Sequence, residues 1–168
     1  MGGCSTIFTC QERPDPAHSR SGTACGGRRA VEANQIVVGM DNSRASAAAL
    51  EWAMCQVRDG GTVVAVSVCG MRTPYGSADV FHSTRLRVMR DAIARISPRE
   101  GVRVEQSVLD GEPGPALVKL AEQADSLVLG LHGYRRGGET VVGSVIVHCL
   151  KHASCPVVVV SSDGTPVT

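Results

Sequence analysis

Residues 126–144 read SLVLGLHGYRRGGETVVGS, a short apolar run followed by a glycine-rich segment and the start of a second apolar run. The run at 126–130 suits a strand that is buried on both faces. The glycines let backbone N–H groups approach an anion closely, and Gly143-Ser144 stands where the next helix would begin. The stretch therefore predicts a strand, an anion-binding loop over 131–143 and a helix, although its composition equally allows a flexible loop with a Ser144 cap.

Short apolar runs recur along the chain and alternate with segments of helical periodicity. We predict strands at 35–40, 62–69, 102–108, 126–130 and 156–160. We predict helices from the Ser43 cap to Gly60-Gly61, near 79–97, from Pro115 to Ala124 and at 144–153. Strands that alternate with single helices imply right-handed crossovers. The predicted fold is α/β, a single doubly wound, Rossmann-like domain whose five-stranded parallel sheet carries helices on both faces.

The two ends of the chain differ from the middle. Residues 1–34 are rich in Gly, Pro and Ser and show no apolar period, so they are predicted to be a disordered N-terminal tail. Residues 35–162 form the predicted α/β domain, and 163–168 a short C-terminal tail.

Composition excludes several classes of function. The formal net charge of +1 gives no basic field for a nucleic acid, and 3% aromatic residues give no stacking platform. No apolar run reaches the ~20 residues that cross a bilayer, so we expect a cytoplasmic protein that binds neither nucleic acid nor membrane. The seven cysteines form no C-x-x-C pair, and no metal site is predicted. Arg85, Arg90 and Arg95 of the second helix are expected to lie in water.

In an open α/β sheet, ligands bind beyond the carboxyl ends of the strands, where the strand order reverses. Asp41-Asn42-Ser43 follows the first predicted strand, Val68 ends the second, and the glycine-rich loop follows the fourth. The loop holds neither a Gly-Lys-[Ser/Thr] Walker sequence nor G-x-G-x-x-G. Asp41 therefore faces a candidate ligand, or it only holds the turn before the first helix.

The glycine spacing resembles that of a known family. Gly130-x2-Gly133-x9-Gly143-Ser144 matches the G-x2-G-x9-G-[S/T] motif of the nucleotide-binding branch of the universal stress protein family. Residues 36–43, 111–113 and 152–157 resemble other blocks of that family in the same order, so the resemblance covers about 34–162. One departure is Asn42, where family members often carry Gly; Asn tolerates the same tight turn.

The resemblance implies a bound ATP, with or without Mg²⁺, and a homodimer that forms through the last strand. It assigns these residues to the nucleotide: Asp41, Val68, Gly130, Gly133, Gly143, Ser144 and Val145. The glycines and Ser144 would hold phosphates together with the Val145 N–H. Asp41 would face the adenosine end, and Val68 resembles the position whose backbone reads adenine.

No catalytic residues are assigned. Phosphoryl transfer needs metal ligands and a positioned base, whereas the loop has no Lys and the sequence shows no clear carboxylate pair. We therefore expect an adenine-nucleotide-binding stress-response or signalling module that is regulatory and non-catalytic. The alternatives are a slow ATP hydrolase, a cyclic-AMP-binding protein and a ligand-free dimeric interaction scaffold.

Overall fold

The computed structural model describes residues 33–70, 78–96, 100–131, 134–136 and 139–167. The predicted tail at 1–34 therefore lies outside the described residues, except for its last two positions. Gly133 of the glycine motif lies outside them as well.

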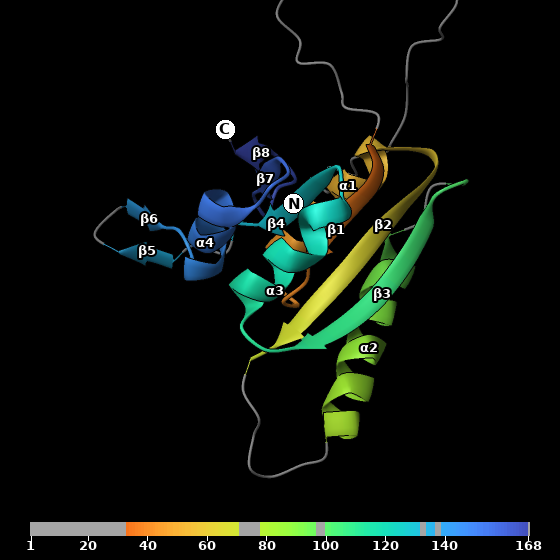
Figure 1. Cartoon of the computed structure of the whole chain (residues 1–168), viewed down its shortest axis with the longest axis horizontal. Coiled ribbons are helices and arrows are strands. Elements are labelled where there is room, and N and C mark those ends of the chain that lie inside the picture. Colours follow the sequence, from red (N-terminus) through yellow and green to blue (C-terminus); the bar gives the residue numbers. More distant parts are fainter. Residues whose placement is uncertain (1–32, 71–77, 97–99, 132–133, 137–138, 168) are drawn as a thin grey trace, which may run out of the picture. The chain divides into compact units, whose positions relative to one another are not determined.

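Strands and helices alternate up to residue 130, and a hairpin of two short strands then precedes the last helix (Figure 1). The elements are β1 (Ala33–Gly39), α1 (Arg44–Gln56), β2 (Val57–Cys69), α2 (Ala78–Arg95), β3 (Arg103–Asp110), α3 (Pro113–Leu120), η1 (Ala121–Gln123), β4 (Ser126–Gly130), β5 (Tyr134–Arg136), β6 (Glu139–Val141), α4 (Ser144–His152), β7 (Val157–Val160) and β8 (Pro166–Val167). The main sheet has the order β3-β2-β1-β4-β7-β8, and β5 pairs with β6 in a separate antiparallel hairpin. All pairs from β3 to β7 are parallel, so the α/β prediction is confirmed.

The main sheet has six strands, and the prediction of five was wrong. The sixth strand, β8, pairs antiparallel with β7 and lies in the predicted C-terminal tail. The chain reverses direction in a turn before β8, which is held because the Ser161 N–H and hydroxyl both donate to the Thr165 carbonyl at 2.9 Å. Asp163 accepts from the Thr165 N–H at 3.0 Å. Hydrogen bonds from the Ser161 hydroxyl and the Thr165 N–H lower the pKa of the Asp163 carboxyl.

Two strands begin earlier than the apolar runs indicate. β1 begins at Ala33 because the Asp125 carboxylate accepts from the N–H groups of Asn34 and Gln35, at 2.7 and 2.9 Å. β2 begins at Val57, within the segment predicted to end the first helix. Its register against β1 shifts between Ala33 and Gln35, so the glycines at 60–61 belong to an irregular strand rather than to a helix end.

Helices cover both faces of the sheet, as predicted (Figure 1). One core cluster packs α1 and α2 against alternate residues of the strands, among them Ile36, Val38 and Ala65. The other cluster packs α3 and α4 against Val37, Val66 and further residues of the opposite face. The alternation of side chains along β2 thus decides which helix layer each residue meets.

Within the described ranges no helix is long and apolar enough to cross a membrane. Cys149 is buried, and burial raises the pKa of its thiol.

Candidate functional site

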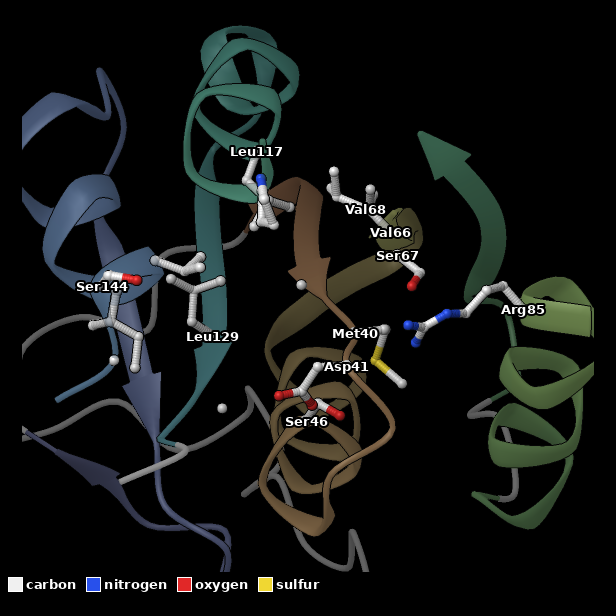
Figure 2. Close-up of a pocket in the computed structure, with 16 residues that line it drawn as sticks. Met40, Asp41, Ser46, Val66, Ser67, Val68, Arg85, Leu117, Leu129 and Ser144 are labelled. Carbon is white, nitrogen blue, oxygen red and sulfur yellow. The ribbon is translucent and has the colours of Figure 1, made fainter. Parts of the chain in front are cut away.

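A cavity of about 300 Å³ opens at the carboxyl ends of β1, β2 and β4 (Figure 2). Its walls also come from α2, α3 and the start of α4. Most of the residues that the family resemblance assigns to the nucleotide line it: Asp41, Val68, Gly130, Gly143, Ser144 and Val145. The fold therefore gathers into one space residues that are up to about a hundred positions apart in the sequence.

The start of α4 forms one end of the cavity. Gly143 is the N-cap, with φ −62° and ψ 148°, and it has no side chain that could cap the first N–H groups of the helix. Ser144 is the first helical residue and is exposed, so it is not the cap that the sequence allowed. The first N–H groups of a helix have no partner within the helix, and its dipole favours an anion at this point. This end of the cavity suits a phosphate.

The β1–α1 turn forms another wall. Asp41 Oδ1 accepts from the Ser43 N–H at 2.9 Å, and Ser43 Oγ caps α1 by accepting from the Ser46 N–H at 3.0 Å. Asn42 between them has a φ of 68°, which Asn tolerates better than most residues. Asp41 thus holds the turn and also lines the cavity, so the two interpretations of this residue are compatible.

The end of β2 supplies the wall next to this turn. The Met40 N–H donates to the Val66 carbonyl at 2.7 Å, which continues the pairing of β1 and β2 up to the cavity. Val66 and Val68 belong to the face that α3 and α4 cover. Ser67, between them, points to the opposite face and is 1% exposed.

Gly130 is required by packing, whether or not a phosphate binds. A Cβ at this position would lie 2.4 Å from the carbonyl carbon of Ala45 and 2.5 Å from the Ser46 nitrogen. The start of α1 therefore rests directly on the end of β4. The first glycine of the motif lines the cavity, and it also has a structural reason that is independent of any ligand.

Sequence reasoning missed several lining residues. Arg85 of α2 lines the cavity and is partly buried, so the prediction that it lies in water with Arg90 and Arg95 was wrong. Ser67, Leu117 and Ile146 line the cavity as well. Helical periodicity places Arg85 outside the apolar face of α2, and nothing in the sequence distinguishes it from the other arginines of that helix.

The charges at the cavity lie together. Among the lining residues that the structure describes, only Asp41 and Arg85 carry charged side chains. In Figure 2 Ser144 lies at one end and Arg85 at the other, with Asp41 and Met40 nearer to Arg85. In the described part of the chain no three or more His, Cys, Asp or Glu residues gather where they could hold a metal ion. The described part of the cavity therefore has one end whose helix N–H groups suit an anion, an apolar middle, and a polar end with one charge of each sign.

The sequence matches known proteins over this same region. The model of the universal stress protein family matches residues 32–161. Universal stress protein Rv2624c from Mycobacterium tuberculosis strain H37Rv is 28% identical over 141 residues, which make up 81% of this chain and 51% of the relative. The chain thus spans about half the length of that relative.

Solved structures share the fold. UspA from Lactobacillus plantarum has a TM-score of 0.62 at 23% identity, covering 75% of this chain and 96% of its own. A universal stress protein in complex with cAMP has a TM-score of 0.58 at 23% identity, covering 78% of this chain and 98% of its own. A family member from Arabidopsis thaliana with AMP bound has a TM-score of 0.51 at 22% identity, covering 76% and 91%. Because the family model covers the whole α/β domain, from β1 to β7, the chain belongs to the universal stress protein family.

Proposed function

We propose that this protein binds an adenine nucleotide in the cavity and acts as a regulatory, non-catalytic module of the stress response. The observation that carries the proposal is the start of α4, which lines the cavity and whose N-cap, Gly143, has no side chain to cap the first N–H groups of the helix. Phosphates would lie against Gly143, Ser144 and the Val145 N–H, and the base would lie toward Val68 and Asp41. ATP, with or without Mg²⁺, is the proposed ligand.

Cyclic AMP is the second candidate ligand. One structure of similar fold was solved with cAMP and another with AMP, so adenine nucleotides with few phosphates occupy proteins of this architecture. The proposal further holds that the protein works in the cytoplasm as a homodimer and passes on its ligand state through other proteins.

Calorimetric titration of the full chain with ATP, ADP, AMP and cAMP, with and without Mg²⁺, tests this function. We expect a dissociation constant in the micromolar range, which corresponds to a binding free energy of about −8 kcal/mol. Gly143→Val places a branched side chain where the phosphate would approach, and we expect it to weaken ATP binding at least about tenfold. Ser154→Val is the matched control, since it adds the same side chain at an exposed position beyond the other end of α4.

Thermal melts of both variants show whether they fold. Unchanged ATP affinity in a folded Gly143→Val protein would contradict the proposed site. Stronger binding of cAMP than of ATP would favour the second candidate. ADP released over many turnovers, and abolished by Asp41→Ala with binding retained, would contradict the non-catalytic part of the proposal.

A further inference from the structure

The cavity extends past the carboxyl edge of the sheet to the face that α1 and α2 cover. Val66 and Val68 of β2 face α3 and α4, whereas Ser67 faces the opposite helix layer. Ser67 and Arg85 both line the cavity. In Figure 2 the Ser67 hydroxyl and the Arg85 guanidinium point toward the same part of it, beside Met40.

The Ser67 hydroxyl is the first indication that a ligand binds in this part of the cavity. The residue is 1% exposed, and its Oγ has no hydrogen-bond partner. Nine in ten buried polar groups have such a partner, because leaving a hydroxyl without one is costly. A hydroxyl can both donate and accept, so a ligand atom of either kind would satisfy it.

The Arg85 guanidinium is the second sign. Its side chain is partly buried, and the described residues offer it no hydrogen bond or ion pair. One turn earlier on α2, His82 Nε2 lies 2.8 Å from Asp110 Oδ1 at the end of β3. This contact ties α2 to the sheet on the side from which Arg85 reaches the cavity.

The surroundings favour a base over a phosphate at this end. Asp41 lines the same part of the cavity as Arg85, and its carboxylate would repel a bare phosphate. An adenine instead offers ring nitrogens that accept from a guanidinium and an exocyclic amine that donates to a carboxylate. The apolar walls of Met40, Val66 and Val68 suit a flat ring.

We propose that Ser67 and Arg85 form a base-reading subsite on the α2 side of the cavity, where they hydrogen-bond the edge of the adenine ring. The subsite rests on the proposed function, because it takes the base of the nucleotide whose phosphates lie at α4. Arg85 donates to ring nitrogens, and Ser67 gains the hydrogen-bond partner that the protein itself does not supply.

The test for Arg85 uses probes that differ in phosphate number: adenosine, AMP, ADP, ATP and inorganic tripolyphosphate, each titrated by calorimetry. We expect Arg85→Met to weaken binding of the four adenine compounds by the same factor, about tenfold, and to leave tripolyphosphate binding unchanged. Arg85→Lys keeps the charge but loses the planar fork, so it should recover only part of the loss. Arg90→Met, at an exposed position of the same helix, is the matched control and should change nothing.

Ser67→Ala supplies an independent readout. Removing a buried hydroxyl that has no partner should leave the melting temperature of the free protein unchanged or higher, while adenosine affinity falls about fivefold. A structural hydroxyl would give the reverse, a lower melting temperature with unchanged affinity.

The failures are distinguishable. If the wild-type protein binds adenine nucleotides and Arg85→Met binds them equally well, the subsite is wrong and the proposed function stands. If the loss grows from AMP to ATP, Arg85 holds phosphate and the base-reading role is overturned. If the wild-type protein binds none of the adenine compounds, the proposed function fails and the subsite with it.

Discussion

At Gly130 a single hydrogen takes the place that any side chain would need. The Cβ of an alanine would lie 2.4–2.6 Å from backbone atoms of Ala45 and Ser46, which are themselves fixed by the N-terminal turn of α1. We expect Gly130→Ala to lower the free energy of unfolding by about 1–3 kcal/mol, because the helix must move off the sheet. Urea denaturation of the ligand-free protein measures this change.

Gly70→Ala is the control for that measurement. Among the described residues, a Cβ at Gly70 would meet only the Gly111 carbonyl, at 3.9 Å, so its effect should stay within about 0.5 kcal/mol. Equal losses in the two variants would contradict the packing role of Gly130. If Gly130→Ala destabilises the ligand-free protein, a loss of nucleotide binding in this variant does not by itself show that Gly130 contacts a phosphate.

Single residues of the site were predictable where a spacing carried them. The G-x2-G-x9-G-[S/T] pattern pointed to Gly130, Gly143 and Ser144, and the structure brings them to one cavity. Ser67 and Arg85 could not be predicted as lining residues, because a serine in an apolar strand and one arginine among several show nothing unusual in sequence. Their position depends on how α2 lies against the sheet, which is a tertiary property.

At the scale of elements, the start of β1 depends on a side chain from the segment before β4. The Asp125 carboxylate accepts from two successive N–H groups of β1, and its own N–H donates to the Gln35 carbonyl at 2.9 Å. We expect Asp125→Ala to cost about 1–2 kcal/mol, because the hydrogen bonds to the carboxylate are lost. Urea denaturation measures it, with Glu122→Ala as the control at an exposed carboxylate of η1.

Hydrogen exchange adds a local readout to the same variant. Faster exchange at Asn34 and Gln35, with the centre of β1 still protected, would show that the carboxylate fixes the strand's start. Unchanged exchange at these two amides would contradict the role given to Asp125.

Elements were predictable where their apolar period was strong. The alternation of buried strands and amphipathic helices fixed the parallel core, since each βαβ unit allows one handedness. β8 escaped prediction because two residues carry no period, and its pairing depends on the hydrogen bonds of Ser161 and Asp163 in the preceding turn. The early start of β2 was not predicted, because Gly60-Gly61 is typical of a helix end.

For the whole molecule, the proposed homodimer and the observed sheet compete for one edge. The family resemblance implies pairing through the last strand of the parallel sheet, which is β7. β7 pairs with β4 on one side, and β8 pairs with its Val159 and Val160. An unpaired strand edge is a template for another chain, and a short covering strand blocks it. A dimer through β7 would therefore require β8 to leave, or to serve as the new edge.

Removing residues 163–168 distinguishes these arrangements. If β8 blocks the edge, we expect the truncated chain to dimerise at lower concentration than the full chain, because the N–H and C=O groups of Val159 and Val160 become available. Light scattering after gel filtration, over a range of concentrations, measures the dimerisation of the truncated and the full chain. Weaker dimerisation on truncation would instead place β8 in the interface. Equal dimerisation of the two chains would exclude this edge of the sheet as the interface. The next candidate is then α4, where Val147 and Leu150 are 38% and 57% exposed, and Leu150→Lys is the variant that tests it.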